Sequence, residues 1–190
     1  MGTEPVEGAL AGTESGPRSA AATGLQQQRS SIANTVDVAG PSSDKPLWYW
    51  SFEDLDGQAR LLNEWQGPYL VINFWATWCP PCLKEIPSFV ALQNKFRNDN
   101  VQFIGVAYDH AEAVKEFVAK TEINYPILLG GDDVAVFMRD LGNKIGALPF
   151  TAVVDGSGKV VTTHQGEWHQ ADAEEALRGL LAKDGRIDGR

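Results

Sequence analysis

The feature that most constrains the fold is the position of the chain's only two cysteines. Cys79 and Cys82 stand three residues apart, directly after an apolar run at residues 69–75, YLVINFW. Apolar residues then recur at spacings of three and four as far as Phe96, which predicts a helix. The expected order of strand, short turn and helix places Cys79 just before the helix and Cys82 in its first turn.

This placement favours a reactive thiolate. The first N–H groups of a helix have no partner within the helix, and the helix dipole is positive at that end. A thiolate at Cys79 would be stabilised there, and the thiolate is the form that attacks disulfides. Pro80 and Pro81 are tolerated because first-turn N–H groups have no helical partner. Cys82 is placed to attack a mixed disulfide on Cys79 and release the product.

Other interpretations of the cysteine pair are weaker. Two buried cysteines that only fill space need neither this spacing nor two prolines between them. A structural zinc site takes about four ligands, and the chain has no second cysteine pair, while its three histidines show no ligand spacing. We therefore expect no metal site. A structural disulfide stays open, although so short a loop constrains the unfolded chain only slightly. The CxxC pattern favours redox chemistry.

Residues 71–82, VINFWATWCPPC, followed by LKEIP at 83–87, resemble the thioredoxin superfamily. More narrowly, they resemble the envelope thiol–disulfide reductases of the TlpA/ResA group, over about residues 46–183. The resemblance implies an α/β, thioredoxin-like fold with a mixed central sheet flanked by helices. It implies a protein-disulfide oxidoreductase in the periplasm or cell envelope, serving cytochrome c maturation or another assembly pathway there. The expected partners are protein disulfide substrates and an upstream electron-donor thiol protein; we expect no cofactor and a monomer.

The same resemblance implies a substrate-binding surface around the cysteines. Leu148-Pro149 occupies the position where the family has a cis proline beside the cysteine motif. The residue before that proline, here Leu148, pairs its backbone with the substrate in the family. Trp78 and Pro80, which flank the first cysteine of the motif, are expected to contact the substrate as well.

One departure from the family's pattern concerns proton transfer. Thioredoxins carry a buried aspartate two residues before the position of Trp75, and it helps to move the proton of the second cysteine. This chain has Asn73 there, which cannot act as a base. Glu85 lies three residues after Cys82, on a neighbouring face of the helix, and envelope reductases of this group resemble it in that glutamate. We expect Glu85 to carry the proton; the alternative is a charge that only complements the helix dipole.

Charge and hydropathy restrict the partners and the location. A net charge of −9 and a pI near 4.8 argue against binding to nucleic acid and against electrostatic adhesion to anionic lipid. No run approaches the roughly 18 apolar residues of a transmembrane helix. The opening residues lack the basic region and apolar core of a signal peptide. The sequence leaves open a cytosolic protein or one whose signal or anchor has been removed.

Composition divides the chain near residue 45. Residues 1–45 are rich in small and polar residues and contain no aromatic residue, so they bury too little apolar surface to offset their ordering entropy. We interpret them as a flexible tail or linker, with a short helix at 25–36 as an alternative. Residues 46–190 form the predicted thioredoxin-like domain. It opens with a hairpin extension, Trp48–Phe52 and Gln58–Leu62, around the turn signal Asp56-Gly57.

The remaining pattern predicts alternating strands and helices. A buried strand is expected at 101–108, and helices at 111–120, 132–141 and 171–182. A hairpin is expected at 151–155 and 159–163, around a Gly-Ser-Gly turn. Alternation that ends in an antiparallel hairpin implies a mixed sheet covered on both faces.

Two other functions compete with disulfide reduction. A copper chaperone would hold a soft metal such as Cu(I) through Cys79 and Cys82. A thiol peroxidase of related fold is disfavoured, because such an enzyme pairs a lone peroxidatic cysteine with a distant resolving one. The direction of electron flow depends on the reduction potential of the pair against that of its compartment, and the resemblance favours a reductase.

Overall fold

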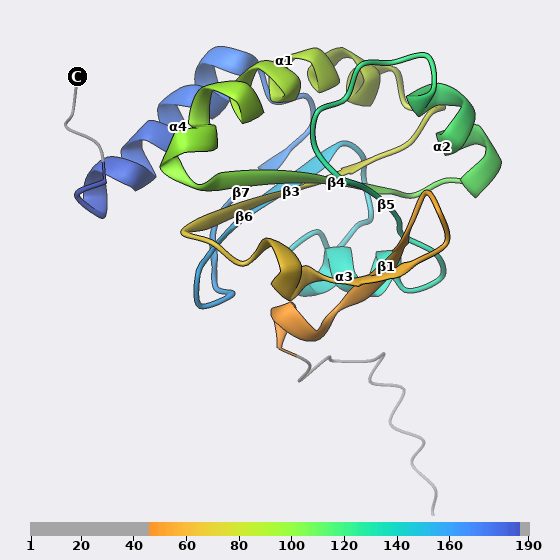
Figure 1. The fold of residues 1–190 in the computed structure, drawn as a ribbon, viewed down its shortest axis with the longest axis horizontal. Coiled ribbons are helices and arrows are strands. Elements are labelled where there is room, and N and C mark those ends of the chain that lie inside the picture. Colours follow the sequence, from red (N-terminus) through yellow and green to blue (C-terminus); the bar gives the residue numbers. More distant parts are fainter. Residues whose placement is uncertain (1–45, 187–190) are drawn as a thin grey trace, which may run out of the picture. The chain divides into compact units, whose positions relative to one another are not determined.

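A computed structural model describes residues 46–186 of the chain. Its centre is a mixed sheet, drawn in Figure 1. The sheet has seven strands in the order β2-β1-β5-β4-β3-β6-β7. The mixed sheet flanked by helices that the sequence predicts is confirmed. The strands are β1 Ser51–Asp54, β2 Ala59–Leu61, β3 Tyr69–Trp75, β4 Val101–Ala107, β5 Ile127–Leu129, β6 Phe150–Asp155 and β7 Val160–Gln165. The helices are α1 Pro80–Phe96, α2 Ala111–Val118, α3 Val134–Asp140 and α4 Gln170–Lys183, with short 3-10 turns η1 Leu47–Tyr49, η2 Leu62–Trp65 and η3 Arg97–Asp99.

Strand β3 is the middle of the sheet and carries the cysteine motif at its end. It pairs in parallel with β4 and antiparallel with β6, and all seven of its residues are buried. Helices α1, α2 and α4 cover one face of the sheet, and α3 covers the other (Figure 1). Because helices cover both faces of the sheet, the sequence of β3 is a nearly continuous apolar run and does not alternate between apolar and polar residues.

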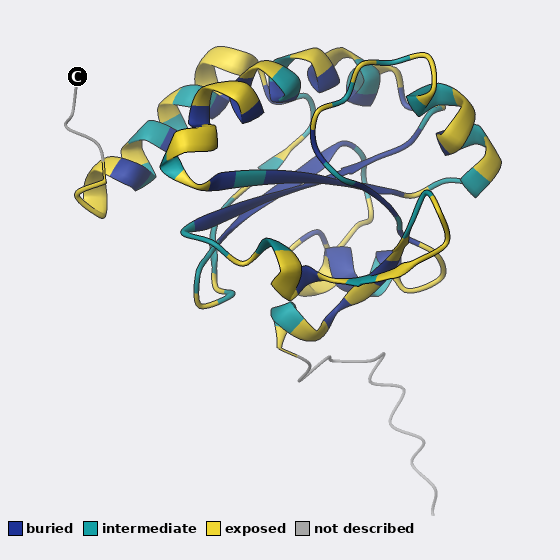
Figure 2. Ribbon diagram, viewed as in Figure 1, coloured by how far each residue is buried: buried dark blue, intermediate teal, exposed yellow. Residues whose placement is uncertain are grey.

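The residues of β3 alternate between two cores, as side chains on a strand must. Val71 and Trp75 pack with the buried sides of α1 and α4, while Ile72 and Phe74 pack with α3 on the opposite face. Figure 2 shows the buried residues concentrated in the sheet and on the inner sides of the helices. Asn73 shares the face of Val71 and Trp75, so its side chain is directed toward α1.

The N-terminal hairpin is confirmed, but its strands are displaced and its role differs. Leu47–Tyr49 forms a 3-10 turn, so β1 begins at Ser51 instead of Trp48. Leu62 likewise belongs to η2 and not to the second strand. Strand β1 also pairs antiparallel with β5, through Glu53 and Leu129. The hairpin therefore continues the central sheet.

The other predicted elements are confirmed with small shifts at their ends. Strand β4, helices α2, α3 and α4 and the hairpin of β6 and β7 lie where the sequence places them. Strand β5 was not predicted. The proposed tail and its alternative helix at 25–36 lie outside the described residues. Within residues 46–186, no helix combines the length and the apolar character needed to cross a bilayer.

Candidate active site

Cys79 and Cys82 form a disulfide at the start of α1. The sulfur atoms are 2.00 Å apart and the Cα atoms 5.3 Å apart. Cys79 is the extended residue that precedes the helix, and Pro80 and Pro81 follow at its first positions. Leu83 N–H donates to Cys79 O at 3.2 Å. The structure therefore puts Cys79 before the helix and Cys82 in its first turn, as the sequence predicts.

The two cysteines differ in their access to solvent. In the disulfide form Cys79 is 4% exposed and Cys82 is not exposed at all. Cys79 is thus less exposed to solvent in this form than the sequence predicts. Of the two cysteines, however, it is the one that keeps some exposed surface. The neighbouring Trp78 and Pro80 are exposed, so two of the four predicted substrate-contact residues lie on the surface on either side of Cys79. Of the other two, Leu148 is half-buried and Pro149 is buried.

Glu85 lies buried one turn beyond Cys82 on the same helix, with 1% of its surface exposed. Its Oε1 accepts a hydrogen bond from Asn73 Nδ2 at 2.7 Å, and its Oε2 accepts one from the backbone N–H of Trp168 at 3.0 Å. Burial raises the pKa of Glu85 to about 7, against the lowering effect of these two hydrogen bonds. A carboxyl group with this pKa exchanges protons readily at neutral pH.

Asn73 is a direct partner of the carboxyl group of Glu85. Its Nδ2 also lies 3.2 Å from Thr151 Oγ1, on the neighbouring strand β6. Its Oδ1 has no hydrogen-bond partner among residues 46–186. The residue that marks the departure from thioredoxins therefore orients the glutamate that is expected to replace the missing aspartate.

Trp168 is the site residue that the sequence did not reveal. It lies just before α4, 83 residues beyond Glu85, and its ring is buried in the core next to α1. The ring also stacks on that of His164, with centroids 5.1 Å apart. Nothing in the local sequence singles out its backbone N–H, because the contact exists only after α4 packs on α1.

The Leu148–Pro149 peptide bond is cis, as the resemblance implies. Pro149 immediately precedes β6, whose first residue, Phe150, pairs with Phe74 near the end of β3. Because β3 and β6 are antiparallel, the end of β3 and the start of β6 lie at the same end of the pair. Pro149 therefore lies beside the start of the cysteine motif. Pro149 O accepts hydrogen bonds from Gly166 N–H at 2.9 Å and from Gln165 Nε2 at 3.0 Å.

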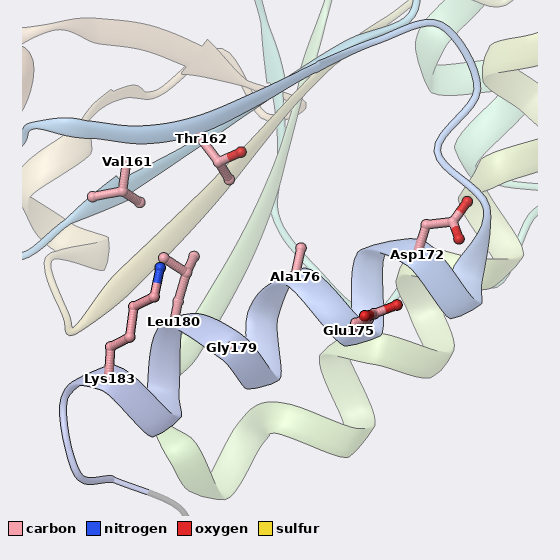
Figure 3. Close-up of a pocket in the computed structure, with 8 residues that line it drawn as sticks. All are labelled: Val161, Thr162, Asp172, Glu175, Ala176, Gly179, Leu180 and Lys183. Atoms are coloured by element: carbon pink, nitrogen blue, oxygen red, sulfur yellow. The ribbon is translucent and has the colours of Figure 1, made fainter. Parts of the chain in front are cut away.

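The part of the chain that the structure describes also has a surface hollow away from the cysteines. A hollow between β7 and α4 is lined by side chains such as Thr162, Ala176 and Lys183 (Figure 3). None of the predicted site residues lines it. In the part of the chain that the structure describes, no group of three or more His, Cys, Asp and Glu side chains is arranged to hold a metal ion.

Comparison with known proteins agrees with this geometry. Residues 39–178 match the Redoxin family. A thiol-disulfide oxidoreductase ResA of Bacillus cereus is 34% identical over 137 residues, which cover 68% of this chain and 71% of the relative. ResA of Bacillus subtilis (strain 168) is 28% identical over 148 residues, 77% of this chain and 78% of the relative.

Two solved structures show the same fold. A thiol:disulfide interchange protein of the thioredoxin family from Chlorobium tepidum TLS superposes with a TM-score of 0.63 at 28% identity, over 72% of this chain and 95% of that one. MTB DsbF, in mixed oxidised and reduced forms, gives a TM-score of 0.61 at 28% identity, over 71% and 97%. The chain therefore belongs to the Redoxin family and is a ResA/TlpA-like member of the thioredoxin superfamily.

Proposed function

We propose that this thiol–disulfide oxidoreductase reduces protein disulfides in the bacterial cell envelope, in cytochrome c maturation or another assembly pathway. The observation that carries the proposal is the Cys79–Cys82 disulfide at a helix start, followed one turn later by a buried carboxyl group with a pKa near neutrality. The names of its ResA relatives support the same chemistry.

The reaction begins with the reduced cysteine pair. The thiolate of Cys79 attacks one sulfur of the substrate disulfide, forms a mixed disulfide and releases the other substrate sulfur as a thiolate, which takes up a proton. The thiol of Cys82 then loses its proton to Glu85 and attacks the sulfur of Cys79. This step forms the Cys79–Cys82 bond and releases the second substrate thiolate, so two electrons pass from the pair to the substrate.

Glu85 suits the second step because Cys82 is fully buried. Burial in apolar surroundings raises the pKa of a thiol, so a nearby base is needed to form the nucleophile. The alternative, a charge that only complements the helix dipole, fits less well. Glu85 lies beyond the first turn of α1, and both oxygens of its carboxyl group are held by buried donors.

We also propose that the protein acts as a monomer and is returned to its dithiol form by an upstream thiol protein. The disulfide state of the pair is the product of each turnover, so a two-electron donor must reduce it before the next one. The donor thiolate attacks the Cys79–Cys82 disulfide at the sulfur of Cys79, the same atom that attacks the substrate when the pair is reduced. This is consistent with one docking site, shared by donor and substrate, around Trp78 and Leu148.

The test is to separate the two steps of the exchange. A Cys82→Ser variant should accumulate mixed disulfides with substrate, and limiting alkylation of the reduced protein should label Cys79 first. Glu85→Gln should slow resolution of the mixed disulfide by at least about tenfold, since general base assistance contributes roughly 10²–10⁴-fold, and should change attack by Cys79 much less. Preferential labelling of Cys82, or wild-type resolution in Glu85→Gln, would contradict these roles.

The competing functions have separate readouts. A copper chaperone would lose function with its metal, so retained reduction of insulin disulfides after exhaustive dialysis excludes that function. A thiol peroxidase would consume peroxide at a rate that depends on Cys79 alone. A measured reduction potential of the Cys79–Cys82 pair decides between reductase and oxidant, because it fixes the direction of electron flow against a given compartment.

A further inference from the structure

A hollow opens at the edge of the sheet where three neighbouring parallel strands end. Strands β3, β4 and β5 run in parallel and are adjacent in the sheet. The loop after each strand contributes to the hollow: Trp78 follows β3, Tyr108 follows β4 and Asp132 follows β5. The carboxyl ends of parallel strands are where α/β folds commonly bind ligands. The hollow has a volume of about 650 Å³.

Exposed aromatic rings form part of its wall. Trp78 is 64% exposed and Tyr108 is 42% exposed, and they are two of the few large apolar side chains that residues 46–186 leave open to solvent. Trp78 directly precedes Cys79, so one wall of the hollow belongs to the residue next to the reacting cysteine. Gly131, with a φ of +57° and open space where a Cβ would stand, keeps the third side of the hollow clear.

The charge of the hollow is negative. Asp109 and Asp132 line it together with His110, and no lysine or arginine among the described residues does. Asp109 is held in place by Thr77, whose backbone N–H donates to Oδ2 at 2.9 Å and whose hydroxyl donates to the same atom. Burial would raise the pKa of Asp109, but hydrogen bonds from Thr77 and from the N–H of His110 keep it below its ordinary value. Asp109 therefore presents a fixed negative charge near the cysteine motif.

We infer that this strand-end hollow binds a positively charged side chain of the protein substrate, next to the cysteine that Cys79 attacks. The faces of Trp78 and Tyr108 attract a cation through their ring electrons, and the two aspartates supply the opposite charge. The inference rests on the proposed function and names its substrate class: protein disulfides with lysine or arginine beside the reacting cysteine.

Matched peptide substrates provide the test. Three peptides with the same disulfide carry lysine, norleucine or glutamate beside the target cysteine, and their reduction by the wild-type protein is followed at about pH 8, where histidine is ordinarily neutral. We expect kcat/KM for the lysine peptide to exceed that for the glutamate peptide by about tenfold, with norleucine between them, since surface ion pairs and cation–π contacts are individually modest. The ratio should shrink as salt is added.

Variants then locate the effect on the surface. Asp132→Asn and Tyr108→Leu should each lower the ratio of lysine to glutamate by about threefold or more, because each removes one of the attractive groups. Asp99→Asn is the matched control, with the same loss of charge. Asp99 lies in η3, just before β4 begins, and the length of the strand puts it about 20 Å from the hollow. Its ratio should equal that of the wild type.

The outcomes separate this inference from the proposed function. Equal reduction of all three peptides would overturn the inference and leave the proposed function standing. The same fall in the ratio for Asp99→Asn as for Asp132→Asn would also overturn it, because the preference would then reflect the net negative charge of the whole protein. Failure to reduce any of the peptides would contradict the proposed function itself.

Discussion

Replacement of Glu85 by glutamine should change how the stability of the oxidised protein depends on pH. Glutamine keeps the size of the side chain and remains neutral at every pH. Its single oxygen can accept from only one of the two donors, Asn73 or Trp168, so the variant carries an offset in stability that does not depend on pH. The difference in slope between the two proteins therefore reports the ionisation of Glu85 alone.

The magnitude follows from the pKa of the buried carboxyl group. Below pH 4.5, the ordinary value for glutamate, the native and unfolded states both hold the proton; between there and about 7 only the native state does. Because the unfolded state loses its proton first, the free energy of unfolding falls by about 1.4 kcal/mol for each pH unit in this window. The free energy of unfolding of the wild type should thus fall by roughly 3 kcal/mol relative to that of Glu85→Gln as the pH rises from 4.5 to 7.

Urea unfolding of the oxidised proteins at half-unit pH steps measures this difference. The control is Glu122→Gln, an exposed glutamate in the loop after α2, whose curve should run parallel to that of the wild type. The wild-type curve should instead descend relative to Glu85→Gln through the window and level off above pH 7. Parallel curves for wild type and Glu85→Gln would refute the reasoning, since the carboxyl group would then titrate alike in both states.

Three further predictions concern other parts of the fold. Asn73→Leu removes a donor to the Glu85 carboxylate, so the pH at which mixed-disulfide resolution is half maximal should rise by about one unit or more, as measured by stopped flow; an unchanged profile would remove Asn73 from the proton-transfer site. Leu177→Ala, at a fully packed core position of α4, should lower the free energy of unfolding by about 2–4 kcal/mol in urea; a loss under about 1 kcal/mol would mean that the α1–α4 core collapses around the gap. Removal of residues 1–44 should leave the melting temperature and disulfide reduction nearly unchanged, because that stretch is poor in apolar residues; a fall of several degrees in calorimetry would show that it packs on the domain.

The sequence predicted the fold where a single element carries its own pattern. The apolar run of β3, the periodic apolar residues of α1 and the cysteine pair between them are local signals, and the structure follows them. Strand β5 was not predicted because its three residues, Ile127–Leu129, are too few to show the alternation of apolar and polar residues that is typical of a strand. The beginning of β1 was misplaced because the aromatic run at 47–52 reads as one strand, whereas its first residues turn in a 3-10 conformation.

In the active site, too, the sequence predicted what depends on one element and missed what depends on contacts between distant segments. The positions of Cys79, Cys82 and Glu85 depend on one helix and could be derived from spacing alone. The partners of Glu85 could not, because Asn73 and Trp168 reach it from a strand and from a loop far along the chain. The strand-end hollow depends on three loops that only the order of the sheet brings together.

The contact between Trp168 and Glu85 has a consequence for the timing of activity during synthesis. Both cysteines and Glu85 leave the ribosome more than 80 residues before Trp168 does. Until α4 packs on α1, Glu85 lacks its burial against that segment, which is the largest cause of its raised pKa. This outweighs the missing hydrogen bond from Trp168 N–H, which lowers the pKa, so the pKa of Glu85 stays closer to 4.5. A carboxyl group that acidic is a poor base for a thiol at neutral pH. An unfinished chain would therefore bind other thiol proteins through Cys79 but release them slowly, and efficient turnover would begin only when the last helix is in place.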